Sequence, residues 1–154
     1  IHATGSIEWE IATGIYRDRG LDKCPNIQFV EYINDMPLKM AAADVVVCRA
    51  GANTVSELAL MKKAAIFIPS PNVTDNQQFK NAEVIAARGG ALVIEEKDIT
   101  REKLGGMIAS LLDSEEKRRG MGEKIYGFAV PDANRRIYED ILRLIESKKS
   151  KKVK

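Results

Sequence analysis

A short segment between a strand-like run and a helix-like run carries residues suited to binding an anion. Residues 44–48, which are apolar after Asp44, predict a buried strand, and residues 54–63 predict a helix. The first turn of a helix has N–H groups without an acceptor and the positive end of the helix dipole, so it favours phosphate. Small residues here would let the backbone approach a ligand, and Asn or Thr could cap the helix or donate to phosphate oxygens. The candidate residues are Arg49, Gly51, Ala52, Asn53 and Thr54.

Two charged residues near this segment each have a structural and a functional interpretation. Glu57, one turn into the helix, could simply be stabilised by the helix dipole. It could instead accept hydrogen bonds from ribose hydroxyls, as acids do in dinucleotide-binding folds. Arg49 could form a structural ion pair or contact a phosphate. The GxxxxGK[ST] pattern of a P-loop is absent, so the strand–glycine–helix turn alone leaves both interpretations open.

Amide side chains gather after the next predicted strand. Residues 64–69 predict that strand, and a polar loop follows it into a helix predicted over 75–90. Amides offer paired donors and acceptors, which suit sugar hydroxyls; the alternative is a capped helix with solvated amides. Two polar segments at the same edge of a sheet favour a site for a nucleotide sugar. The candidate sugar-binding residues are Gln77, Gln78 and Asn81.

The amino-acid composition limits the number of domains and the kinds of partner and cofactor to expect. The chain has 154 residues, 45% of them hydrophobic, which fits one domain with a real core. A net charge of +2 gives no sign of a nucleic-acid partner. Cys24 and Cys48 do not form a CxxC pair, and His2 is the only histidine. These observations predict neither a metal site nor another cofactor.

The termini give weaker signals. No apolar run reaches the ~20 residues needed to span a bilayer, and no signal peptide is visible. The basic tail over 149–154 predicts a solvated C-terminus, with weak attraction to an anionic membrane as the alternative. The chain begins with Ile1 rather than Met, which we interpret as an internal residue of a longer protein.

Strand-like and helix-like segments alternate along the chain. Strands are predicted at 1–4, 26–33, 44–48, 64–69 and 91–96, and helices at 6–20, 35–43, 54–63, 75–90, 100–113, 115–128 and 132–148. Ser6, Ser114 and Asp132 are the predicted N-caps for three of the helices. This alternation indicates an α/β fold, a Rossmann-like parallel sheet with helices on both faces, which binds ligands at the carboxyl ends of its strands.

Several segments together resemble one family. The sequence "ADVVVCRAGANTVSELA", followed by "IPSPNVTDNQQFKNA", "GGALVIEEKDIT" and "PDANRRI", resembles the C-terminal domain of the MurG family. Those enzymes move N-acetylglucosamine (GlcNAc) from UDP-GlcNAc to a lipid-linked muramyl pentapeptide. The upstream "IHATG" and "FVEYINDM" are also similar to family segments, so the likeness extends over residues 1 to about 143.

The resemblance implies a glycosyltransferase of the GT-B type, built from two Rossmann domains and needing no bound metal. Arg49 and residues 51–54 would face the diphosphate, and Glu57 would hold the ribose hydroxyls. Tyr32 and Ile33 would lie beside uracil, with Ile33 contacting it through backbone groups. The amides of Gln77, Gln78 and Asn81 would reach the GlcNAc.

It also implies a division of the chain. Residues 1–130 would be an incomplete C-terminal UDP-GlcNAc-binding domain that lacks its first strand–helix unit. Residues 131–148 would be a helix that crosses back to an absent N-terminal domain. That absent domain would supply the catalytic base, the lipid-linked acceptor site and most of the contact with the cytoplasmic face of the bacterial membrane. No catalytic residue is then expected in this chain, and its uncovered surfaces could self-associate.

Departures and alternatives remain. Ala3 stands where the family usually has glutamine, and Gln77 stands where many members have histidine. One alternative is the donor subunit of another UDP-GlcNAc transferase. A second, from a different class, is a nucleotide-binding module without catalysis.

Overall fold

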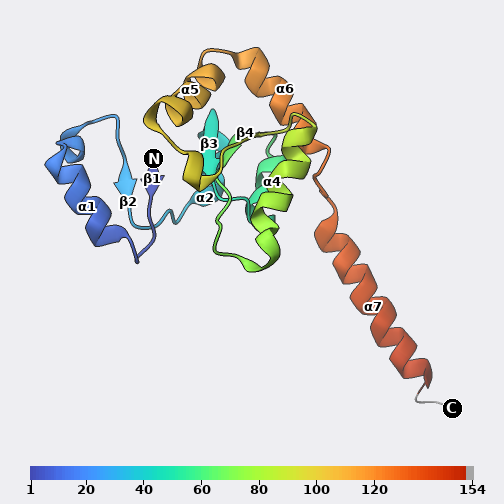
Figure 1. The fold of residues 1–154 in the computed structure, drawn as a ribbon. Coiled ribbons are helices and arrows are strands. Elements are labelled where there is room, and N and C mark those ends of the chain that lie inside the picture. Colours follow the sequence, from blue (N-terminus) through green and yellow to red (C-terminus); the bar gives the residue numbers. More distant parts are fainter. Residues whose placement is uncertain (152–154) are drawn as a thin grey trace. The chain divides into compact units, whose positions relative to one another are not determined.

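Short parallel strands form the framework of the computed structural model, which describes residues 1–151 with side chains through residue 148 (Figure 1). The chain divides into two compact units, Ile1–Lys39 and the residues from Met40 onward. Each unit has its own parallel ladder. The predicted parallel α/β class is therefore confirmed, with the described strands divided between two ladders.

The first unit is a strand–helix–strand arrangement held by aromatic side chains. Its ladder pairs β1 with β2 in parallel. The Phe29 ring of β2 stacks on Tyr16 and Trp9, with ring centroids 4.0 Å and 4.7 Å apart, and such pairs stabilise beyond their buried area. His2 accepts or donates a 2.8 Å hydrogen bond between its Nδ1 atom and the Tyr16 hydroxyl. The elements are β1 (His2–Ala3), α1 (Trp9–Asp18), η1 (Leu21–Lys23) and β2 (Phe29–Val30), and α2 (Met36–Ala42) follows.

The second unit is built around a three-stranded parallel ladder in the order β3–β4–β5. The central strand β4 is buried along its whole length, as expected for a strand with neighbours on both sides and helices on both faces. The elements are β3 (Val45–Cys48), α3 (Ala52–Leu60), β4 (Ala64–Phe67), η2 (Thr74–Asn76), α4 (Gln77–Ala87), β5 (Leu92–Val93), η3 (Glu96–Asp98), α5 (Arg101–Leu112), α6 (Glu115–Tyr126) and α7 (Ala133–Lys151).

Alternating residues of β4 enter two different core clusters, because successive strand side chains point to opposite faces. Ala65 and Phe67 pack with Leu58 of α3 and Ile85 of α4. Ala64 and Ile66 pack instead with a cluster that contains Leu111 of α5. Helices α4 and α5 accordingly lie on opposite sides of the strands (Figure 1). The predicted covering of both faces by helices is confirmed for this unit.

Helix α6 packs very closely on the turn between α3 and β4. A Cβ atom built on Gly122 would lie 2.2 Å from the Lys62 carbonyl oxygen, so only glycine allows this approach. The Lys62 ammonium donates to the Glu123 carboxylate at 2.9 Å and lies 4.6 Å from the centre of the Tyr126 ring. Lys62 itself has a φ of 52°, in the left-handed region. The turn and the helix are therefore fixed against each other.

Several predicted helix starts differ from the structure. Helix α1 begins at Trp9 with Glu8 at the N-cap position, so the predicted Ser6 cap is wrong. Helix α4 begins at Gln77 rather than at 75, because Asp75 and Asn76 take positive φ values of 53° and 51°. The Ser114 cap is confirmed, since its hydroxyl accepts from the Lys117 N–H at 3.1 Å.

Helix α7 presents apolar side chains to solvent. They recur at helical spacing, and each is between 47% and 62% exposed: Ile137, Ile141, Leu144 and Ile145. Asp132, just before the helix, pairs with Arg136 at 2.9 Å. The helix continues to Lys151, while residues 152–154 of the predicted basic tail lie outside the described residues. None of the helices in the described part of the chain is both long and apolar enough to cross a membrane.

Candidate functional site

The predicted anion site lies where β3 gives way to α3. The helix begins at Ala52, with Gly51 at the N-cap position and no side chain capping it. Asn53 and Thr54 lie inside the first turn, so neither is the N-cap that the sequence allowed. The N–H groups of this turn have no acceptor within the helix. They remain available to an anion, with the helix dipole behind them.

Gly51 is not required by the backbone. Its φ of −67° is ordinary for any residue. A Cβ atom built on it would meet only the Thr54 hydroxyl oxygen, at 4.0 Å. Since neither conformation nor packing demands glycine here, its effect is to leave the N-terminus of α3 uncovered. That is the geometry expected where a ligand approaches the backbone.

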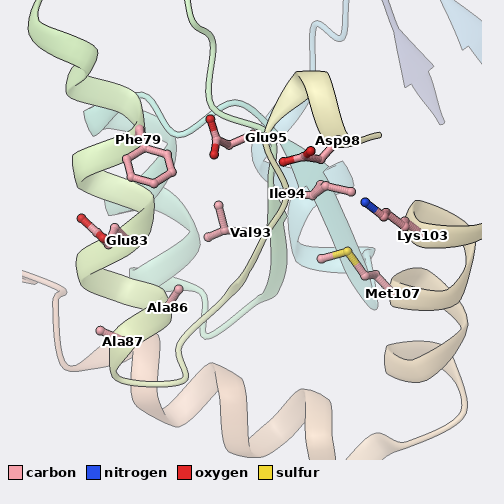
Figure 2. Close-up of a pocket in the computed structure, with 10 residues that line it drawn as sticks. All are labelled: Phe79, Glu83, Ala86, Ala87, Val93, Ile94, Glu95, Asp98, Lys103 and Met107. Carbon is pink, nitrogen blue, oxygen red and sulfur yellow. The ribbon is translucent and has the colours of Figure 1, made fainter. Parts of the chain in front are cut away.

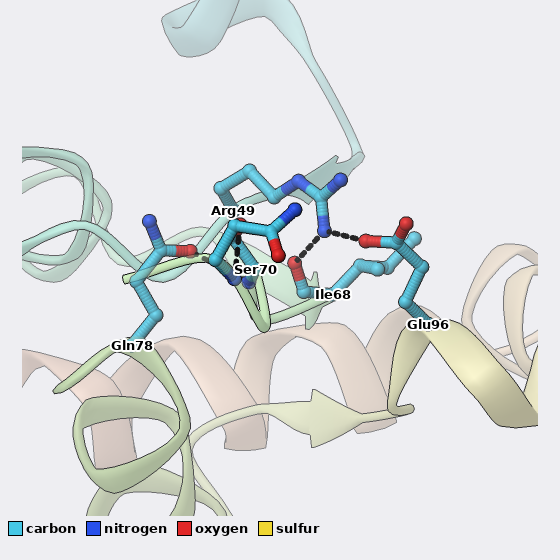
Figure 3. Close-up of polar contacts among 6 residues, drawn as sticks. Arg49, Ile68, Ser70, Gln78 and Glu96 are labelled. Carbon is cyan, nitrogen blue, oxygen red and sulfur yellow. Dashed lines mark hydrogen bonds and ion pairs between the residues drawn. The ribbon is translucent and has the colours of Figure 1, made fainter. Parts of the chain in front are cut away.

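Arg49 forms the ion pair that the sequence left open. Its Nη1 atom donates to the Glu96 carboxylate at 2.7 Å and to the Ile68 carbonyl at 3.1 Å (Figure 3). The arginine and glutamate side chains are 50% and 49% exposed. A half-exposed pair of this kind contributes little to stability. The Nε and Nη2 atoms of Arg49 have no hydrogen-bond partner among the residues described, so the guanidinium can still bind an anion.

Glu57 lies on an exposed part of α3. Its carboxylate makes no hydrogen bond or ion pair with another residue in the described part of the chain. Both carboxylate oxygens are free to accept hydrogen bonds from a ligand.

The amide segment reaches the anion site through Asn81. Its Nδ2 atom donates to the Ala50 carbonyl at 3.1 Å, and its Oδ1 atom accepts from Gln77 at 3.1 Å. Gln78 turns to the loop before α4, where its Oε1 atom accepts from the Ser70 N–H at 2.9 Å (Figure 3). The two predicted polar segments thus lie beside each other. Two of the three amides are partly used to hold the local backbone.

Ile33 stands apart from the other candidates. It follows β2 in the first unit and is half-buried, and its neighbour Tyr32 is 74% exposed. The remaining candidate residues all belong to the second unit. The contact of Ile33 with uracil stays a prediction.

One cavity lies away from these candidate residues. A volume of about 730 Å³ lies between α4, β5 and α5, and none of the predicted site residues lines it (Figure 2). Phe79, Val93 and Met107 form its apolar part, and Glu83, Glu95 and Asp98 contribute carboxylates. Its position follows from the outer edge of β5, which no further strand covers among the described residues.

The structure also describes the environment of Cys48 and the placement of possible metal ligands. Burial raises the pKa of the Cys48 thiol to about 12, and Cys48 packs against the first core cluster. It therefore behaves as a small apolar residue. The residues described hold no group of three or more His, Cys, Asp or Glu side chains that could bind a metal ion.

Sequence reasoning missed Glu96 and Ser70 as contributors to this site. Glu96 follows β5, and Ser70 follows β4 by three residues. The carboxyl ends of parallel strands meet at one edge of a sheet, so the position after the last strand could have indicated Glu96. The Ser70 contact is made by its backbone N–H, which carries no signal in the sequence.

Comparisons with known proteins agree on one family. Residues 1–137 match the glycosyltransferase family 28 C-terminal domain. A UDP-N-acetylglucosamine–N-acetylmuramyl-(pentapeptide) pyrophosphoryl-undecaprenol N-acetylglucosamine transferase of Acetivibrio thermocellus is 41% identical over 148 residues, covering 96% of this chain and 39% of that protein. The transferase of the same name from Flavobacterium psychrophilum is 41% identical over 125 residues, covering 81% and 34%.

A solved structure gives the same result. The crystal structure of Acinetobacter baumannii MurG matches with a TM-score of 0.77 and 30% identity, covering 92% of this chain and 40% of that one. The chain thus spans between about a third and two-fifths of the length of these relatives. With the parallel fold, the open helix start and the family match over residues 1–137, the chain belongs to the glycosyltransferase family 28 C-terminal domain family.

Proposed function

We propose that this chain is the donor-binding part of a longer inverting glycosyltransferase. The full enzyme would move GlcNAc from UDP-GlcNAc to a lipid-linked muramyl pentapeptide, which converts lipid I to lipid II in peptidoglycan synthesis. The names of the two transferases from Acetivibrio thermocellus and Flavobacterium psychrophilum describe such a transfer. The reaction would take place at the cytoplasmic face of the bacterial membrane, with acceptor and membrane contacts made mainly by residues outside this chain.

One observation carries the proposal. The Asn81 amide donates to the Ala50 carbonyl at 3.1 Å, so an uncovered helix N-terminus and a cluster of amide groups lie side by side. The helix N-terminus suits a diphosphate, and the amides suit sugar hydroxyls. A nucleotide diphosphate sugar presents both groups next to each other. A ligand with only one of them would leave half of the site unused.

Each candidate residue would bind a different part of the donor. Arg49 and the backbone of residues 51–54 would bind the diphosphate, Glu57 would accept from the ribose hydroxyls, and Ile33 would contact uracil. The Nε2 atom of Gln78 has no partner among the described residues and would contact the GlcNAc, together with Gln77 and Asn81.

In the reaction, an acceptor hydroxyl oxygen would attack the anomeric carbon of GlcNAc with inversion. The bond from that carbon to the diphosphate oxygen breaks, and its electron pair leaves with UDP. The acceptor proton passes to a base outside this chain. The helix start and Arg49 would stabilise the charge that develops on the diphosphate, because fixed dipoles and cations need no reorganisation. This chemistry requires no metal ion or other cofactor.

Calorimetry on the longer protein tests the donor assignment. UDP-GlcNAc and UDP should both bind, and UDP-glucose should bind more weakly than UDP-GlcNAc. Equal affinity for both sugars would favour a different UDP-sugar enzyme. Binding of UDP-GlcNAc without any transfer to a lipid I analogue would favour the donor subunit of another transferase or a non-catalytic nucleotide-binding module.

A second test compares this chain with the longer protein. Transfer of radiolabelled GlcNAc to a lipid I analogue should occur only with the longer protein. Holding both substrates in reacting geometry contributes up to ~7–11 kcal/mol of the barrier, and a general base adds about 10²–10⁴-fold. Turnover by this chain within about tenfold of the longer protein would contradict the division of roles.

Helix α7 would contact the part of the enzyme outside this chain. Its apolar side chains at 137, 141, 144 and 145 are exposed, and a row of this kind usually packs against a partner. In this chain alone the same row could associate with a second copy. Changing Ile141 to Ser should leave the thermal stability of this chain nearly unchanged. The same change should lower transfer activity of the longer protein.

A further inference from the structure

Arg49 connects the carboxyl ends of three consecutive strands. It follows β3 directly, and its Nη1 atom donates to the carbonyl of Ile68, which follows β4, at 3.1 Å. The same atom donates to Glu96 of η3, which follows β5, at 2.7 Å. One guanidinium nitrogen therefore fixes the arginine to the two neighbouring strand ends (Figure 3).

The other side of the guanidinium is left free. An arginine side chain has five N–H donors in a planar fork. Both of these contacts use Nη1, while Nε and Nη2 have no partner among the residues described. Figure 3 shows the rest of the guanidinium pointing away from Ile68 and Glu96. A planar edge with two parallel donors is the part of arginine that binds a phosphate through two hydrogen bonds.

The negative charge of Glu96 would by itself oppose the binding of an anion at this place. A carboxylate near an anion site repels a diphosphate. The pair is also half-exposed, with side chains 50% and 49% accessible, so it contributes little to the stability of the fold. Its effect must therefore lie in the orientation of Arg49. An unbound arginine side chain has many rotamers, and fixing it before the ligand arrives removes that entropic cost from binding.

We infer that Glu96 is a positioning residue for the diphosphate of the donor: it holds one nitrogen of Arg49 so that the opposite edge faces the ligand. This role rests on the proposed function, because it needs a diphosphate at the start of α3. In this role Glu96 acts through Arg49, to which its carboxylate is bonded at 2.7 Å, so its removal should weaken ligands that carry a diphosphate and spare those that carry none.

The test compares UDP with uridine on the longer protein by calorimetry. Glu96→Ala should weaken UDP by about fivefold, as expected for a half-exposed charged pair, and should leave uridine nearly unchanged. Glu96→Gln keeps an oxygen that accepts from Nη1, so it should restore UDP affinity to about the wild-type value. Glu95→Ala is the matched control, because Glu95 pairs with Lys97 at 3.1 Å in the same segment.

A double-mutant cycle shows whether Glu96 acts through Arg49. In an Arg49→Ala background, Glu96→Ala should cause no further loss of UDP affinity. Equal losses for UDP and uridine, no loss for UDP, or an unchanged effect in the Arg49→Ala background would each overturn the role of Glu96 alone. A wild-type protein that binds no UDP would overturn the proposed function as well, which separates the two failures.

Discussion

The Asn81 side-chain amide donates a 3.1 Å hydrogen bond to the Ala50 carbonyl, across 31 positions of sequence. Ala50 is fully buried and directly precedes the Gly51 N-cap of α3. Asn81 lies on α4 and also accepts from Gln77 at 3.1 Å. One side chain therefore connects the start of α3 to the amide cluster.

Replacing Asn81 by Asp should destabilise the chain and weaken donor binding. The carboxylate has nearly the same shape, but it cannot donate to Ala50 and would place two oxygens against each other. Leaving a buried carbonyl without its donor costs ~1–3 kcal/mol. Urea unfolding measures this loss. Asn72→Asp is the control, because Asn72 is exposed and undergoes the same change in charge; an equal loss in both variants would refute the specific role of Asn81.

Replacing Glu57 by Ala should weaken UDP and UDP-GlcNAc equally. If the carboxylate accepts from ribose hydroxyls, its loss should cost ~1.5–3 kcal/mol of binding free energy. Because the Glu57 carboxylate makes no hydrogen bond or ion pair with another described residue, the thermal stability should hardly change. Glu102→Ala, in the first turn of α5, is the control. Donor KM values unchanged from wild type in the Glu57 variant would remove ribose binding from its role.

Replacing Gln78 by Ala should weaken UDP-GlcNAc more than UDP. Its Oε1 atom is occupied by the Ser70 N–H at 2.9 Å, so the Nε2 atom is the group left for the sugar. A binding site discriminates strongly against a ligand that lacks a hydrogen-bonding group, because the polar groups of the site are then left unpaired. Isothermal titration of both ligands gives the ratio, with Lys80→Ala on the same helix as the control. Equal losses for the two ligands would indicate an effect on the loop rather than on the sugar.

Alanine at two glycines of α6 should have opposite effects on stability. At Gly122 the new Cβ would lie 2.2 Å from the Lys62 carbonyl oxygen, and such overpacking costs ~1–3 kcal/mol or more. At Gly120 it would meet nothing within 4 Å, and a helix-interior alanine gains roughly 0.5–1 kcal/mol over glycine. Thermal unfolding of both variants tests this. A similar loss at both positions would mean that α6 does not pack as described.

Cys48 should react slowly with thiol reagents, because burial raises its pKa to about 12 and the thiolate is the reactive form. A Cys24→Ser variant isolates this thiol, and mass spectrometry follows labelling by iodoacetamide. Labelling should accelerate in denaturant. Above the ordinary pKa of 9.0 the unfolded chain loses this proton while the folded chain keeps it, so stability should fall as the pH rises toward 12. Rapid labelling of the native protein near neutral pH would contradict this.

Much of the fold could be predicted because strands and helices differ in period and composition. The run Val45–Cys48 is apolar throughout, which correctly indicated a strand, but the strand is not buried as predicted, since Val47 is 40% exposed. Helix ends were less predictable. Asp75 and Asn76 read as an ordinary helix start, but both adopt left-handed backbone angles, which polar residues tolerate in turns. Local sequence does not distinguish these two outcomes.

For the candidate site, the local backbone arrangement could be predicted, but most of the side-chain contacts could not. Helix starts and glycine are visible locally, so the uncovered start of α3 at residues 51–54 could be anticipated. The partner of Arg49 could not be identified by spacing, because Glu96 lies 47 positions away. The bond from Asn81 to Ala50 uses a backbone carbonyl, which every residue carries. Such contacts depend on the spatial order of the strands in the sheet, β3–β4–β5, and this order cannot be read from a single sequence.

The aromatic stack of the first unit provides an optical probe. Trp9 is the only tryptophan in the chain, and it stacks on Phe29 at 4.7 Å. Intrinsic fluorescence excited at the tryptophan band therefore reports on the surroundings of β2, while Arg49 and Glu57 belong to the other unit. A titration in which heat is released while emission stays constant would record binding that the first unit does not sense. A shift of emission in step with the heat is expected if Ile33, which follows β2 in the first unit, contacts the uracil.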